Sequence, residues 1–152
     1  ALEFHHQTGG CISKHNEEQR KKQSPYNYLY FVLNDDRQKL YDRIDRRIDE
    51  MLEQGLVDEV AELVNHGCTR DMVSMQGLGY KEILDYLDGS CTLEEAVYRL
   101  KRDTRHFAKR QLTWFKREPD VHWLNREDKT EDELLNQMLS LVKKQIPVSE
   151  NE

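Results

Sequence analysis

A long amphipathic helix, predicted over residues 93–117, is the feature that most constrains the fold of this chain. Residues 92–95 (TLEE) have the pattern of a capping box, which starts a helix, and Pro119 ends it. The apolar side chains of this helix fall on one face: Leu93, Ala96, Val97, Leu100, Phe107, Ala108, Trp114 and Phe115. Thr104 and Gln111 are predicted to project into the middle of that face, where buried polar groups need hydrogen-bond partners.

The other predicted helices are shorter and are bounded by capping residues or glycines: 35–54, 56–66, 80–88 and a last one capped by Thr130 and Glu133. Asp35 is predicted to start the first of these, with Gln38 completing its capping box.

Residues 26–33 (YNYLYFVL) are rich in aromatic and β-branched side chains and are predicted to form a strand. Such an apolar strand suits a sheet covered on both faces, which this chain, with one further short strand at 121–124, does not easily provide. We expect a mainly α fold with one or two short strands. It divides into a polar loop or short helix at 1–25, a helical core at 26–125, and a C-terminal helix and tail at 126–152.

Charge is unevenly distributed along the chain. The segment from Arg99 to Arg117 holds eight Lys or Arg and one acid, Asp103, so it carries +7, and against −6 overall the remainder carries −13. A basic stripe inside an acidic protein predicts a localised anion-binding site.

Several classes of protein are excluded. No apolar run approaches membrane-spanning length, and no signal peptide is visible. The cysteines are odd in number and widely spaced, which favours reduced thiols in a cytoplasmic protein. Cys11 and His15, with His5 and His6 nearby, lack recognised zinc spacing, so no metal site is predicted.

Arg47 is the first candidate site residue. Arg43 and Arg47 lie on one side of the helix after the strand, and Arg47 borders its apolar stripe. Like charges four residues apart are mildly destabilising, so an anion is expected across from them. The alternative is that Asp36, Asp42 or Glu50 neutralises them on a solvated surface.

The second candidate is the loop 74–81 (SMQGLGYK). Its two glycines let a backbone approach a ligand closely, its serine and glutamine offer hydrogen bonds, and Tyr80 offers a stacking face. The alternative is a tight turn before a helix.

The third candidate is the pair of basic flanks on the long helix. One flank holds Arg102, Arg105, Lys109 and Lys116, and the other holds Arg99, Arg110 and Arg117. Two such flanks can track a phosphate backbone, whereas the alternative is an ordinary solvated surface.

Taken together, these segments resemble the C-terminal half of the tRNA dimethylallyltransferase (tRNA isopentenyltransferase) family. The resemblance runs from Ala1 to about Asn125, in order and spacing. Its motifs are ALE with TG near the start, the run from Arg37 to Leu56, SMQGLGYKE at 74–82 and TRHFAKRQLTWF at 104–115. The last motif is long and specific.

The resemblance implies transfer of a dimethylallyl group from dimethylallyl diphosphate to N6 of adenosine 37, next to the tRNA anticodon, assisted by Mg²⁺. It also implies that the chain is part of an α/β P-loop nucleotide-kinase-like fold with an inserted helical domain. Arg47 occupies the position of a family arginine that contacts the diphosphate. The implied tRNA-binding residues lie in two of the motifs: Ser74, Met75, Gln76, Gly77, Leu78, Gly79, Tyr80, Thr104, Arg105, Lys109, Arg110 and Gln111.

Some family features are missing. The sequence has no G-x-x-x-x-G-K-[ST] loop for the diphosphate and lacks the family's general-base aspartate, and residues 126–152 carry no family signature. Since it begins with Ala1, we expect a fragment whose missing N-terminal P-loop half is a partner, and which is inactive alone. Two alternatives stay open: a stand-alone helical RNA-binding module, and an interaction domain whose last helix docks on a protein.

Overall fold

The two segments predicted as strands pair with each other. In the computed structural model, which describes residues 2–22, 25–127 and 129–145, β1 (Tyr30–Asn34) and β2 (Val121–Asn125) form a parallel two-stranded sheet. β1 begins four residues later than expected, because its register with β2 starts at the pair Tyr30–Val121. Val32 is 7% exposed and the next residue, Leu33, is 57% exposed, so the described residues cover only one face of the sheet.

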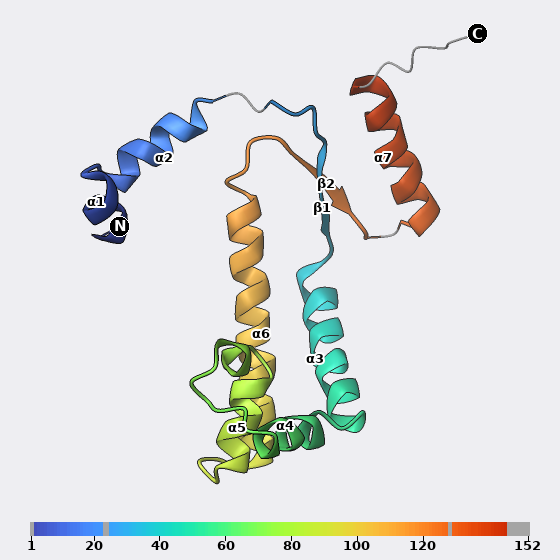
Figure 1. The fold of residues 1–152 in the computed structure, drawn as a ribbon. Coiled ribbons are helices and arrows are strands. Elements are labelled where there is room, and N and C mark those ends of the chain that lie inside the picture. Colours follow the sequence, from blue (N-terminus) through green and yellow to red (C-terminus); the bar gives the residue numbers. More distant parts are fainter. Residues whose placement is uncertain (1, 23–24, 128, 146–152) are drawn as a thin grey trace.

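The helical core is the connection between the two strands, since parallel strands need a long crossover. It contains α3 (Arg37–Glu53), α4 (Leu56–Asn65), the 3₁₀ turn η1 (Val73–Gln76), α5 (Tyr80–Leu87) and α6 (Leu93–Phe115). The long helices α3 and α6 lie side by side, and α4 and α5 gather at the end that is far from the sheet (Figure 1).

The hydrophobic core lies at that far end, where side chains from all these elements meet: Ile48, Leu56, Val60, Met75, Ile83, Leu84 and Leu100. The predicted apolar face of α6 is therefore confirmed in its first half, where Ala96 and Leu100 are buried. In its second half it is wrong, since Phe107 is 44% and Trp114 54% exposed. Helices α4 and α5 end before that part of α6, which leaves these rings uncovered in this chain.

Helix caps follow the local sequence closely. The capping boxes of Thr92 with Glu95 and of Thr130 with Glu133 are both present. The cap of α3 is Asp36, one residue after the predicted Asp35, because its Oδ1 accepts from the amides of Gln38 and Lys39 at 2.8 and 3.0 Å. The hydrogen bond from the Lys39 amide, above all, lowers the pKa of Asp36.

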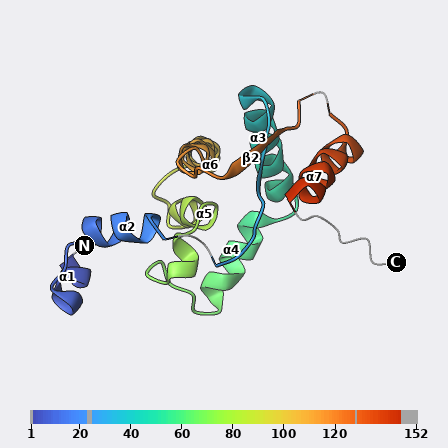
Figure 2. The same cartoon turned by 90° about the horizontal axis from the view of Figure 1, so that it is seen from above.

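The N-terminal segment holds two short helices, α1 (Leu2–Thr8) and α2 (Ile12–Arg20), where a loop or one short helix was predicted. They stand apart from the helical core in Figure 1, and Figure 2 shows both of them on one side of the molecule, next to α5 in that view. The C-terminal helix α7 (Glu131–Gln145) follows β2 and buries Leu134. All three cysteines are free thiols. None of the described helices is long and apolar enough to cross a membrane.

Candidate functional site

The first half of α6 uses its cations to bind neighbouring helices. Arg105 donates to both carboxylate oxygens of Asp45 on α3, at 2.6 and 2.8 Å, and Nζ of Lys101 lies 2.6 Å from Asp49, one turn further along α3. Both ion pairs are partly buried. The resemblance implies that Arg105 binds tRNA, and this stays a prediction; in this structure α3 places an aspartate opposite it.

The remaining cations in this half of α6 are also paired. Arg99 binds Asp85 of α5 at 3.2 Å, and Arg102 donates to the neighbouring Asp103 at 2.8 Å. The hydrogen bond between Arg102 and Asp103 lowers the pKa of the carboxyl group and raises that of the guanidinium. The charge that the sequence concentrates between residues 99 and 105 is therefore largely neutralised within the chain.

The second half of α6 is different. Lys109 and Arg110 lie in this half, and Lys116 and Arg117 follow directly after the last residue of α6. All four are exposed, and none of them makes an ion pair with any residue that the structure describes. We call these four residues the unpaired cations of α6. The guanidinium of Arg110 lies over the ring of Phe107, 5.7 Å from its centroid, which fixes its direction without neutralising its charge. These unpaired charges form a basic surface along this part of the chain.

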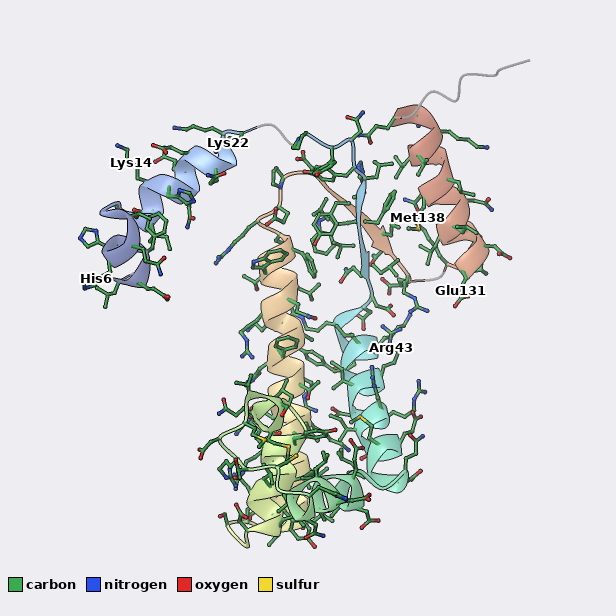
Figure 3. All side chains as sticks on the ribbon, viewed as in Figure 1. His6, Lys14, Lys22, Arg43, Glu131 and Met138 are labelled. Carbon is green, nitrogen blue, oxygen red and sulfur yellow. The ribbon has the colours of Figure 1, made fainter. Side chains whose placement is uncertain are left out.

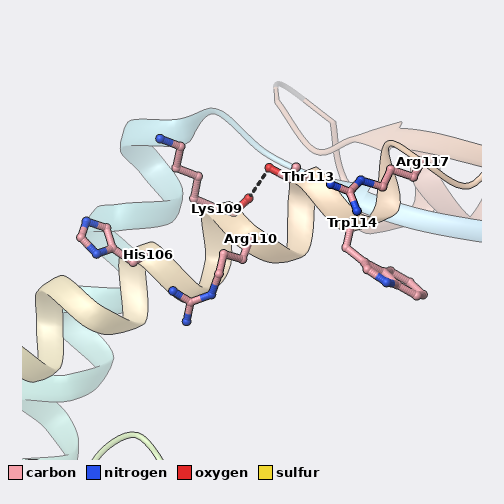
Figure 4. Close-up of a pocket in the computed structure, with 6 residues that line it drawn as sticks. All are labelled: His106, Lys109, Arg110, Thr113, Trp114 and Arg117. Atoms are coloured by element: carbon pink, nitrogen blue, oxygen red, sulfur yellow. Dashed lines mark hydrogen bonds between the residues drawn. The ribbon is translucent and has the colours of Figure 1, made fainter. Parts of the chain in front are cut away.

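A shallow hollow of about 470 Å³ runs along this surface, lined by His106, Lys109, Arg110, Thr113, Trp114 and Arg117. Lys109 and Arg110 leave α6 in opposite directions, while Arg110 and Trp114, one turn apart, point the same way (Figure 4). An exposed indole between guanidinium groups suits an RNA backbone with unpaired bases. Sequence reasoning placed Trp114 in the apolar face and missed it here; its i, i+4 spacing from Arg110 was the available signal.

Arg47 is exposed, as a ligand-binding arginine must be. Its neighbours are neutralised: Arg43, labelled in Figure 3, lies 3.1 Å from Asp35, and Arg46 lies 3.7 Å from Glu50. Arg47 makes no ion pair with the described part of the chain. At about 100° per residue, it lies on the flank of α3 opposite Asp45 and Asp49, which face α6.

The predicted loop is anchored at both ends. The side chain of Met75 is fully buried in the hydrophobic core, so it is not available to a ligand. Gly79 is buried at the start of α5, and the hydroxyl of Tyr80 donates to the carboxylate of Glu59 on α4, which raises the pKa of Tyr80. The exposed members of the loop are Ser74, just before Met75, and Gln76, Gly77 and Leu78, which lie between the two anchors.

The two glycines of this loop have different roles, and a matched pair of variants should separate them. Gly79 has φ +105°, which strains any L side chain, whereas Gly77 has φ −63° and an added Cβ would meet only Ser74 O at 3.6 Å. Gly79→Ala is expected to lower the free energy of unfolding by about 1–3 kcal/mol. Gly77→Ala is expected to leave it unchanged or raise it by up to about 1 kcal/mol. Urea denaturation measures both, and equal effects would contradict these backbone assignments.

Thr104 and Gln111 differ in environment. Thr104 is half-buried, and its hydroxyl donates to the carbonyl of Leu100 at 2.7 Å within α6, so its predicted need for a partner is met locally. Gln111 is exposed, contrary to the expectation that it is enclosed by the apolar face. It lines an open groove of about 190 Å³ beside β1 and the start of α3.

Residues 1–118 match the family model described as IPP transferase. Two curated relatives carry the name tRNA dimethylallyltransferase. The protein of Lachnoclostridium phytofermentans is 61% identical over 143 residues, which is 93% of this chain and 46% of that protein. The protein of Acetivibrio thermocellus is 50% identical over 133 residues, covering 88% and 42%. The chain thus spans less than half the length of these relatives.

Solved structures are similar as well. The tRNA isopentenylpyrophosphate transferase of Bacillus halodurans is 42% identical with a TM-score of 0.74, covering 88% of this chain and 44% of that one. The corresponding enzyme of Staphylococcus epidermidis is 38% identical with a TM-score of 0.76, covering 95% and 47%. A eukaryotic dimethylallyltransferase described as acting on tRNA is 26% identical with a TM-score of 0.71, covering 92% and 40%.

Proposed function

The chain belongs to the IPP transferase family, and on that basis we propose that it is the C-terminal half of a tRNA dimethylallyltransferase. The complete enzyme transfers a dimethylallyl group from dimethylallyl diphosphate to N6 of adenosine 37, next to the tRNA anticodon. This chain supplies the surface that binds the anticodon stem-loop and an arginine that contacts the diphosphate. The rest of the same protein supplies the P-loop and the general base.

The observation that carries the RNA-binding role is the division of α6 into a paired and an unpaired half. A helix that only displayed charge to solvent would have no reason to neutralise one half on its neighbours and leave four adjacent cations without partners. A phosphate backbone is the ligand that matches several unpaired Lys and Arg in a row. The loop between Met75 and Gly79 then has the task of reading the unpaired nucleotides.

The diphosphate role rests on Arg47. As the bond between the dimethylallyl carbon and the diphosphate oxygen breaks, negative charge builds up on the leaving group, and a guanidinium can bind it with two parallel hydrogen bonds. Arg47 is exposed and unpaired among the described residues, so it is available for this contact.

Mg²⁺ is expected in the complete enzyme. The described part of this chain contains no group of three or more His, Cys, Asp or Glu side chains that could hold a metal ion. The proposal places its ligands mostly in the rest of the protein, and we derive no step through the metal.

A chimera tests the proposed function. This chain would replace the equivalent 143 residues of the L. phytofermentans relative, to which it is 61% identical. The chimera is expected to form N6-dimethylallyladenosine in tRNA, detected by mass spectrometry of nucleosides, whereas this chain alone forms none. A folded chimera without product, beside an active relative, would contradict the proposal; if the chain alone still bound the stem-loop, the stand-alone RNA-binding module would be favoured.

A further inference from the structure

Glu82 stands out as a buried carboxylate that the proposed function does not yet use. It is 3% exposed, and no other charged side chain is buried in the part of the chain that the structure describes. Burying a carboxylate is costly unless its oxygens are well bonded, so its place in a core needs a reason.

One oxygen of Glu82 holds the end of the loop. Oε2 accepts a hydrogen bond from the backbone amide of Gly79 at 2.9 Å. Gly79 is the residue with φ +105°. The other oxygen, Oε1, makes no hydrogen bond of good geometry with the described residues, and the ammonium nitrogen of Lys81 lies 3.3 Å from it. Lys81 itself lies close enough to α6 to contribute, after Arg102, to the lowered pKa of Asp103.

Capping alone does not explain this burial. Glu95 and Glu133 occupy the same third position in α6 and α7, each accepting from the amide of a capping threonine, at 3.0 and 2.7 Å, and both are exposed. Those threonines return a hydrogen bond to the helix. At α5 the capping residue is Gly79, which has no side chain to return one, so Glu82 supplies the side-chain half of this capping box without a counterpart, beside the backbone hydrogen bond from Lys81 to Gly77.

The turn at Gly79 ends the loop that carries the exposed polar groups. Met75 fixes its beginning by burying its side chain in the core, and Glu82 fixes its end through Gly79. Between these anchors, Gln76 and Leu78 are exposed, and Ser74 is exposed just before Met75. A loop held at both ends loses little conformational entropy when it binds, which improves affinity and selectivity.

We propose that Glu82 is a positioning residue for RNA-loop recognition. Its two carboxylate oxygens hold the Gly79 amide and the Lys81 ammonium, and so present residues 74–78 and Lys81 to the unpaired loop of an RNA hairpin in one arrangement. Glu82 itself touches no RNA. The inference rests on the proposed function, because it assigns a role in RNA binding to this loop.

The test compares two RNA ligands, an anticodon hairpin and a blunt duplex of the same stem, so that only the first offers unpaired bases. The unpaired cations of α6 bind both, and the duplex therefore reports whether the fold and the phosphate contacts survive. Dissociation constants are measured by fluorescence anisotropy for the wild-type chain, Glu82→Ala, Glu82→Gln and the matched control Glu95→Gln.

Glu82→Ala is expected to weaken hairpin binding about tenfold or more and to leave duplex binding unchanged. Glu82→Gln keeps an acceptor for the Gly79 amide but loses the charge that faces Lys81, so an intermediate loss is expected. Glu95→Gln should match the wild type for both ligands. The inference would be overturned if Glu82→Ala lost the same affinity for the hairpin as for the duplex and the isosteric Glu82→Gln showed no selective loss of hairpin affinity. Glu82 would then be a residue that contributes only to stability.

An unchanged hairpin affinity in both Glu82 variants would also overturn it. If the wild type bound neither ligand, the proposed function would fail, and the positioning role would fall with it. If the wild type bound hairpin and duplex equally, the RNA-binding surface would stand while loop recognition would not. The failure of the inference is thus distinguishable from the failure of the proposed function.

Discussion

Replacing Arg47 with alanine is expected to lower turnover of the chimeric transferase by about 10²–10³-fold while the protein stays folded. The reason is that an arginine on the leaving diphosphate stabilises charge that develops in the transition state, and removing one such contact typically has an effect of this size. Because Arg47 is exposed and makes no ion pair with the described residues, its removal breaks no interaction observed in this chain. Single-turnover kinetics with saturating tRNA measure the effect.

Arg46 provides the matched control. It is the preceding residue on the same helix, equally a surface arginine, and its only described partner is Glu50 at 3.7 Å. Arg46→Ala removes the same charge and should leave turnover within a factor of about two, since exposed pairs contribute little. Arg47→Lys keeps the charge but not the bidentate geometry, so an intermediate rate is expected. Equal rates for the alanine variants would make Arg47 an ordinary surface residue.

Replacing all four unpaired cations of α6 with glutamine is expected to weaken binding of an anticodon stem-loop by about 10³-fold at 0.1 M salt. The set comprises Lys109, Arg110, Lys116 and Arg117. Each phosphate contact contributes roughly 0.7–0.9 to the slope of log K against log salt, which corresponds to about five- to eightfold per contact at that concentration. Their exposure means that the thermal midpoint should hardly change. A variant that still binds as the wild type does would remove this surface from the RNA interface.

Local features were predictable from the sequence because their causes are local. The capping boxes at Thr92 and Thr130 depend on side chains three residues apart, and both formed as expected. Arg47 is exposed and makes no ion pair with the described residues, and the hypothesis that it contacts an anion stays a prediction. The mainly α fold with two short strands likewise followed from periodicity and turn residues.

What the sequence did not show depends on contacts between distant segments. Arg105 and Lys109 are indistinguishable on a helical wheel of basic residues, yet Arg105 meets Asp45, which lies 60 residues earlier. Trp114 has the residue type of a core position, but α4 and α5 do not extend far enough to cover it. Met75 lies in a polar motif, but η1 turns its side chain into the core.

The salt dependence of RNA affinity tests the central claim most directly, because it counts phosphate contacts. Two double variants would be compared with the wild type, and each removes two cations. The first combines Lys109→Gln with Lys116→Gln, and the second combines Lys101→Gln with Arg105→Gln. Lys109 and Lys116 make no ion pair with the described residues, whereas Lys101 and Arg105 are bound to Asp49 and Asp45. We predict that the first variant lowers the slope of log K against log salt by about 1.4–1.8. The second should leave the slope at the wild-type value while lowering stability by about 1 kcal/mol or more. Equal slopes for the wild type and the first variant would contradict the assignment of this surface to RNA.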